Sequence, residues 1–162
     1  MNTLRLFVVS FGFLGCSRFA PGTVGTLGGV LLAWLLRGTD RYLLWTALAC
    51  AMIYLAGRSL GGWSERYAGK KDPGIFVLDE VIGYLITVAW ITGPSVASLA
   101  VGFFVFRFFD IVKPPPARRA EALGGGDGIL LDDVVAGLYG LGVMTIARLV
   151  FDDPVLWSVA AR

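Results

Sequence analysis

The chain has 162 residues, of which 56% are hydrophobic and 16% are charged, with a mean hydropathy of +0.73 and a formal net charge of +2. A soluble domain carries about 25% charged residues, so this composition favours a single domain, residues 1–162, embedded in a bilayer. The small net charge argues against a nucleic-acid-binding protein. The chain contains no histidine, so any chemistry depends on carboxylates, Lys, Arg and hydroxyl groups.

Uncharged stretches predict an all-α fold, a compact helical membrane bundle of about five to seven helices. They cover residues 6–17, 19–36, 42–57, 81–106 and 134–147. The stretch 81–106 is interrupted by Thr92-Gly93-Pro94-Ser95, a turn signal that predicts a helical hairpin. Several of these helices are shorter than the roughly 20 residues that cross a bilayer, so length alone leaves their depth open.

The basic residues predict an orientation for the bundle. If the turn at residues 92–95 is extracytoplasmic, most cations gather on the opposite side, as the positive-inside rule requires of cytoplasmic loops. These cations are Arg18, Arg58, Arg66, Lys70, Lys71, Arg107, Lys113, Arg118 and Arg119, whereas Arg37 and Arg41 lie on the outer side. The polar motifs described next fall on the same side, which we expect to face the cytoplasm from the inner membrane.

The first polar motif is Ala20-Pro21-Gly22-Thr23-Val24-Gly25-Thr26. Pro and Gly before a Thr at a helix start expose backbone N–H groups and the hydroxyls of Thr23 and Thr26, which suit a phosphate. The motif lacks the lysine and the spacing of a nucleotide-binding P-loop. The alternative is a plain helix start followed by small residues for packing.

Two acidic doublets stand at the starts of hydrophobic segments, each with a glycine close behind. They are Leu78-Asp79-Glu80-Val81-Ile82-Gly83 and Leu131-Asp132-Asp133-Val134-Val135-Ala136-Gly137. Four carboxylates beside hydrocarbon are costly unless a cation meets them, and ligands that are all oxygen favour Mg²⁺ or Mn²⁺ over Zn²⁺. One doublet alone would be explained by capping of a helix's first turn, which contributes about 0.3–1 kcal/mol. Two doublets on one membrane face favour a metal site.

Between the doublets, Arg107, Asp110 and Lys113 step by three along one predicted helix face. They form either a structural ion pair with a lysine that reaches water, or an anion clamp. In the clamp, Arg107 and Lys113 bind phosphate, while Asp110 orients one of them or joins the metal site. The stretch Gly124-Gly125-Gly126-Asp127-Gly128 predicts a mobile or tightly turned loop, which either closes over a headgroup or only supplies a turn.

On these residues the chain resembles the phosphatidylglycerophosphatase A family, over most of its length. The motifs that carry the resemblance are Ser10-Phe11-Gly12, Pro21-Gly22-Thr23-Val24-Gly25-Thr26-Leu27, Asp72-Pro73-Gly74, the two doublet segments, Phe106-Arg107-Phe108-Phe109-Asp110 with Lys113-Pro114, Gly125-Gly126 and Gly128-Ile129. The resemblance implies a Mg²⁺-dependent membrane phosphatase that converts phosphatidylglycerophosphate to phosphatidylglycerol. Family members commonly carry a His where this chain has Gly124, so Lys113, Arg107 or water would replace any role of that His.

The chemistry of these residues and the resemblance to the family predict the same mechanism. Asp79, Glu80, Asp132 and Asp133, with Asp110 as a further candidate, hold one or two Mg²⁺, and metal-activated water attacks the phosphate of a phospholipid in the bilayer. The phosphate is held by Arg107, Lys113, Thr23 and Thr26, and the surrounding loops are formed by Pro21, Gly22, Gly125, Gly126 and Gly128. The alternatives are a small ion-binding or transport protein that uses the same carboxylates, and a scaffold whose doublets are only caps.

Overall fold

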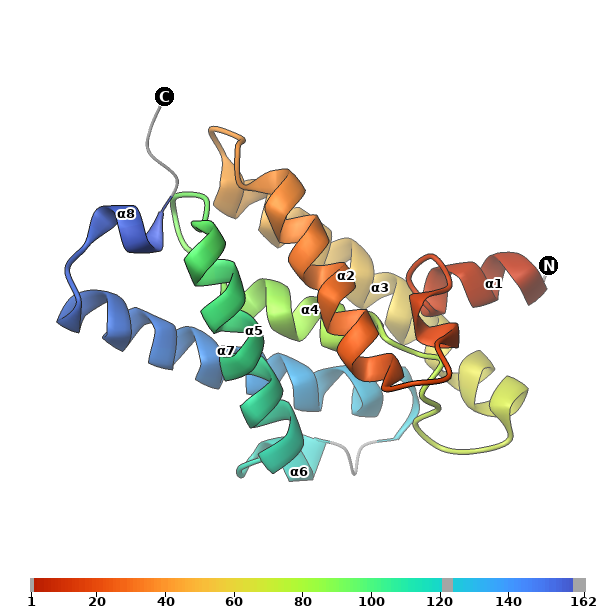
Figure 1. Ribbon diagram of the computed structural model, residues 1–162. Coiled ribbons are helices and arrows are strands. Elements are labelled where there is room, and N and C mark those ends of the chain that lie inside the picture. Colours follow the sequence, from red (N-terminus) through yellow and green to blue (C-terminus); the bar gives the residue numbers. More distant parts are fainter. Residues whose placement is uncertain (1, 121–123, 159–162) are drawn as a thin grey trace.

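The computed structural model describes residues 2–120 and 124–158, and these residues form helices joined by short connections (Figure 1). In chain order they are α1 (Asn2–Val9), the 3₁₀ turn η1 (Leu14–Cys16), α2 (Pro21–Leu36), α3 (Tyr42–Ala68), α4 (Leu78–Thr87), α5 (Val96–Val112), α6 (Ala117–Ala120), α7 (Gly125–Val150) and α8 (Pro154–Trp157). Six of these helices have eight residues or more, so the predicted all-α bundle is confirmed. Within the described ranges, extended pairing is limited to one bridge between Pro94 and Ser158.

The short helix α4 lies at the centre of the bundle. It contacts α2, α3, α5 and α7, and eight of its ten residues are buried. Tyr84 on α4 donates its hydroxyl hydrogen to the carbonyl of Leu99 on α5 at 2.9 Å. A helix of ten residues is about 15 Å long, too short to cross the hydrocarbon of a bilayer. The surroundings of α4 are therefore supplied by neighbouring helices rather than by lipid.

Glycines bring the backbones of α4 and α7 into direct contact. A Cβ added at Gly137 would lie 2.4 Å from the carbonyl oxygen of Gly83, and one added at Gly83 would lie 2.6 Å from the carbonyl oxygen of Asp133. Real side chains do not tolerate such distances to backbone atoms, so this crossing requires glycine on both helices. The predicted role of Gly83 and Gly137 in close helix approach is confirmed.

The predicted interruption at residues 92–95 is also confirmed, because α4 ends at Thr87 and α5 begins at Val96. Ser95 caps α5 by accepting a hydrogen bond from the backbone N–H of Ser98 at 3.0 Å. A Cβ at Gly93 would lie 1.9 Å from the carbonyl oxygen of Arg37, so this turn packs against the end of α2. The C-terminal end of α2 and the N-terminal end of α5 thus share one end of the molecule (Figure 1).

Large apolar side chains cover much of the outer surface. Within the described residues, α3 and α7 are long and apolar enough to cross a membrane. Exposed side chains along the long helices include Trp34, Trp45, Met52, Phe104 and Ile146. So many exposed large apolar side chains are unusual on a soluble protein and favour a surface that meets lipid or protein. The fold and composition together indicate association with a membrane.

The α4–α7 contact predicts a sharp difference between two glycines of α7. We expect Gly137→Ala to destabilise the protein by about 1–3 kcal/mol, because its methyl group would meet the backbone of α4. Gly142→Ala is the matched control, since its Cβ meets nothing within 4 Å. Thermal unfolding in detergent should show a lower Tm for Gly137→Ala and an unchanged or higher Tm for Gly142→Ala. Equal Tm values for the two variants would contradict the proposed backbone contact.

Candidate active site

Three carboxylates from two helices converge beside the α4–α7 crossing. Asp79 and Glu80 lie in the first turn of α4, Asp133 lies on α7, and one oxygen from each lies within 4.8 Å of the other two. The Oδ1 atom of Asp79 and the Oε2 atom of Glu80 are buried without a hydrogen-bond partner among the described residues. Buried carboxylate oxygens are costly without a partner. This trio therefore has the donor chemistry of a site for a hard divalent cation.

Burial controls the charge of the α4 doublet, which lies outside the two helices long enough to span a membrane. Burial raises the pKa of Asp79 well above its ordinary value, and the negative charge of Glu80 adds to this effect. Burial also raises the pKa of Glu80, while its hydrogen bond with Asp79 lowers that pKa and the charge of Asp110 raises it. A cation between these groups would lower both pKa values, because it favours the ionised carboxylates.

The second doublet does not stand at a helix start, so that prediction is wrong. The helix α7 begins at Gly125, which places Asp132 and Asp133 well inside it. Capping therefore does not explain this doublet, because the effect of the helix dipole fades after the first turn. Both residues are buried, and consecutive helix positions point in different directions. Asp133 reaches the trio, while Asp132 lies outside it.

The glycine-rich segment before Asp132 is helical from Gly125 onward, with Gly124 as the N-cap residue, which corrects the predicted loop. Gly125, Gly126 and Gly128 all belong to α7. A Cβ at Gly126 would lie 2.5 Å from the carbonyl oxygen of Arg58 on α3, so this glycine permits close packing of two helices. Asp127 also connects this turn of α7 to α3, because it accepts a hydrogen bond from the Tyr54 hydroxyl at 2.8 Å. Leu123, directly before these glycines, lies outside the described residues.

Pro21 and Gly22 were likewise predicted to form a loop, and both are instead in the first turn of α2. A Cβ at Gly22 would lie 2.4 Å from Oε1 of Glu80 and 3.3 Å from Nη1 of Arg107. The N-terminus of α2 therefore touches both the acidic trio and the cation beside it. Glycine at this position leaves the space that the Glu80 carboxylate occupies.

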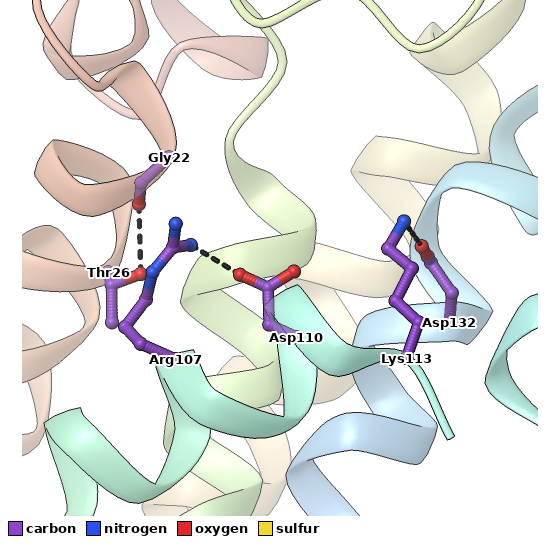
Figure 2. A network of polar contacts seen from close by, with 6 residues as sticks. All are labelled: Gly22, Thr26, Arg107, Asp110, Lys113 and Asp132. Atoms are coloured by element: carbon purple, nitrogen blue, oxygen red, sulfur yellow. Dashed lines mark hydrogen bonds and ion pairs between the residues drawn. The ribbon is translucent and has the colours of Figure 1, made fainter.

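Two cations from the end of α5 meet carboxylates at the site (Figure 2). Arg107 forms an ion pair with Asp110 one turn further along α5. Lys113, which caps the C-terminus of α5, places its Nζ 2.6 Å from Oδ2 of Asp132. The second oxygen of Asp132, Oδ1, is buried and has no hydrogen-bond partner among the described residues. Positive charge thus lies directly beside the trio, although each cation already has a carboxylate partner.

The two threonines of α2 differ in their surroundings. Thr26 is fully buried and donates its hydroxyl hydrogen to the carbonyl of Gly22 at 2.8 Å (Figure 2). Its hydrogen bond is therefore made inside α2. Thr23 lies in the first turn of α2 and is half-buried, which leaves it the better placed of the two for a ligand.

A cavity of about 200 Å³ lies next to Asp132 and was not predicted from the sequence. Its walls are Glu65, Lys71, Asp72, Gly124, Gly125, Gly128, Ile129 and Asp132. Asp72 has a φ of 43°, in the left-handed region where Asp is better tolerated than most residues. Of these walls, Asp72 belongs to the motif Asp72-Pro73-Gly74 of the family resemblance, and Gly125, Gly128 and Asp132 belong to the predicted site motifs.

The sequence profile of the phosphatidylglycerophosphatase A family matches residues 7–148. This range contains the acidic trio, both ion pairs and every wall of the cavity. The chain belongs to the phosphatidylglycerophosphatase A family. Membership in this family makes the protein a phosphatase, and the predicted resemblance is confirmed.

Relatives at moderate identity support the assignment. A phosphatidylglycerophosphatase A of Haemophilus influenzae is 38% identical over 148 residues, which cover 89% of this chain and 88% of the relative. A phosphatidylglycerophosphatase A of Escherichia coli K12 is 32% identical over 148 residues, 88% of this chain and 82% of the relative. A putative phosphatidylinositol-3-phosphatase of Bacteroides thetaiotaomicron is 36% identical over 146 residues, 83% of this chain and 87% of the relative. No solved structure matches the chain.

The trio predicts that a divalent cation stabilises this family member. At a Mg²⁺ concentration one hundred times the Kd, the free energy of unfolding should rise by about 2.7 kcal/mol and the Tm by about 5–10 °C. Asp133→Asn should lose most of this increase, because it removes one ligand charge. Asp152→Asn, at an exposed carboxylate beyond the end of α7, should keep it. A full Mg²⁺-dependent increase in Asp133→Asn would exclude the trio as the binding site.

Proposed function

We propose that the protein is a Mg²⁺-dependent phospholipid phosphatase that hydrolyses the terminal phosphate of phosphatidylglycerophosphate to give phosphatidylglycerol and inorganic phosphate. The observation that carries this proposal is the trio of buried carboxylates from α4 and α7, flanked by the cations of α5. Two relatives bear the name of this activity. The chemistry of the site and the names of the relatives thus agree.

The proposed ligands of the cation are Asp79, Glu80 and Asp133. All their donor atoms are oxygens, and two of these oxygens are buried without a hydrogen-bond partner in the described part of the chain. Hard cations such as Mg²⁺ prefer this donor set. When bound, Mg²⁺ neutralises a phosphate oxygen and lowers the pKa of the water that attacks phosphorus. Asp132 lies next to the trio along α7 and contributes either directly or through water.

The cations of α5 are proposed to hold the remaining phosphate oxygens. Arg107 has five N–H donors, so its ion pair with Asp110 leaves others for a phosphate. Asp110 and Asp132 then orient Arg107 and Lys113 toward the ligand. Thr23 and the backbone N–H groups at the start of α2 face the same region, because Gly22 contacts Glu80 and Arg107.

Hydrolysis forms a bond from water oxygen to phosphorus and breaks the bond from phosphorus to the glycerol oxygen. The departing oxygen needs a proton, and this chain has no histidine to supply one. Arginine does not give up its proton in proteins. Lys113, held by Asp132 at 2.6 Å, is therefore the proposed proton donor, with water as the alternative.

The substrate is proposed to stay in the membrane plane throughout the reaction. Apolar side chains on the outer faces of the long helices suit acyl chains, and the site lies at the opposite end of the bundle from the turn at residues 92–95. Lys70, Lys71 and Arg66 are exposed near the site's end of α3. By the positive-inside rule, this end faces the cytoplasm across the inner membrane.

An ion-transport function fits these features less well. Transporters commonly bind ions at the bilayer midplane between discontinuous helices. Here α7 runs without a break from Gly125 to Val150, and the acidic trio lies near the ends of α2 and α5. A site at one end of the bundle favours chemistry on a lipid headgroup.

Phosphate release from phosphatidylglycerophosphate in detergent micelles tests the proposal. We expect release with Mg²⁺, none with EDTA, and a loss of roughly 10²–10³-fold in kcat for Asp79→Asn, the range found when a charge-stabilising group is removed. Asp152→Asn should retain wild-type turnover. Turnover by Asp79→Asn at the wild-type rate would refute the role of the trio.

The geometry of the phosphate contact is tested by Arg107→Lys. This variant keeps the positive charge but loses the planar fork, so kcat/KM should fall by about tenfold or more. Arg66→Lys, at an exposed position on α3, should leave kcat/KM unchanged. If Arg107→Lys is as active as the wild type, Arg107 acts only through its charge and does not clamp the phosphate.

A further inference from the structure

We propose that the cavity beside Asp132 binds the alcohol side of the substrate and determines which phospholipid phosphate the enzyme accepts. This inference rests on the proposed function, which places the terminal phosphate at the acidic trio. Asp132 links the two regions, because it directly precedes Asp133 of the trio in α7, pairs with Lys113 and forms one wall of the cavity. A phosphate at the trio therefore has its ester oxygen directed toward a neighbouring polar space.

The walls of the cavity suit a polyol. Glu65, in the last turn of α3, and Asp72 contribute carboxylates to the walls, and the start of α7 contributes Gly124, Gly125 and Gly128. Carboxylates accept hydrogen bonds from hydroxyl groups. A Cβ added at Gly124 or Gly125 would meet no atom of the described residues within 4 Å, so these residues leave space beside the start of α7. We assign the free hydroxyl of the substrate's glycerol to Glu65.

The same cavity offers a place for a second anionic group. Lys71 is exposed and lines the cavity, and α7 begins there at Gly125. Its N-cap residue is Gly124, which has no side chain to cap the first N–H groups of the helix. A helix N-terminus and a lysine together favour an anion. Phosphatidylglycerophosphate carries a phosphodiester on the lipid side of its glycerol. We assign this phosphodiester to Lys71 and the N-terminus of α7.

The names of the relatives refer to different lipid phosphates. Proteins that match this chain over most of their length are named for phosphatidylglycerophosphate and, in one case, for phosphatidylinositol 3-phosphate. These two lipids share a phosphomonoester and differ in the alcohol that carries it. The trio does not contact that alcohol in the proposed arrangement, so discrimination has to come from neighbouring walls.

A deoxy substrate tests the assignment of Glu65. In this analogue of phosphatidylglycerophosphate, hydrogen replaces the free glycerol hydroxyl. We expect the wild type to cleave the analogue with a kcat/KM roughly tenfold lower, because a polar group of the site is left unpaired. Glu65→Leu should cleave both lipids with equal kcat/KM. Equal rates for the two lipids in the wild type, or a preserved tenfold difference in Glu65→Leu, would overturn the inference.

A pair of adjacent lysines tests the phosphodiester contact. Lys71→Met should raise KM for phosphatidylglycerophosphate about three- to tenfold with kcat nearly unchanged. Lys70→Met is the matched control, because Lys70 is exposed but does not line the cavity. A rise in KM for this variant would measure the general attraction of a lysine to anionic micelles. Equal KM values for the two variants would remove Lys71 from the pocket. If the wild type releases no phosphate from phosphatidylglycerophosphate, the proposed function itself is wrong. The variant comparisons test only the role of the cavity, so their failure would leave the proposed function standing.

Discussion

The backbone contact between α4 and α7 is the constraint on which the site depends. Gly83 and Gly137 allow the two helices to touch, and each lies about one turn after an acidic doublet. Larger residues at this crossing would push the two helices apart, which would also increase the distance between Glu80 on α4 and Asp133 on α7. The same contact holds α4 inside the bundle, where a short helix has its surface covered by protein. Packing and chemistry therefore depend on the same small residues.

Charge balance is the second requirement of this arrangement. Burying three carboxylates together is unfavourable unless positive charge compensates, and each source of such charge lies at the end of a helix. Arg107 and Lys113 come from the end of α5, and the start of α2 adds its dipole. Arg107 and Lys113 are paired with Asp110 and Asp132, which lie outside the trio, rather than with the three carboxylates of the trio. The two ion pairs thus hold in place the cations that are proposed to bind the phosphate, while the trio is proposed to bind the metal ion.

The sequence predicted the elements that depend on local pattern, and it missed those that depend on tertiary contacts. Apolar stretches and the turn at residues 92–95 located the main helices, and the acidic doublets supplied the three carboxylates that the structure brings together. The start of α7 was missed because consecutive glycines normally disfavour a helix by about 1 kcal/mol each. Packing of Gly126 against α3 and the bond from Tyr54 to Asp127 override that preference. Because the helix was predicted to start later, the different directions of Asp132 and Asp133 could not be foreseen.

Asp79, Glu80 and Asp133 are proposed to form one metal site, and anomalous diffraction from crystals grown with Mn²⁺ in place of Mg²⁺ can locate the ion. A peak is expected between α4 and α7, about 2 Å from a carboxylate oxygen of each of the three residues. Crystals that bind Mn²⁺ elsewhere, for example at Asp152 and Asp153, but show no peak at this position would refute the proposed site.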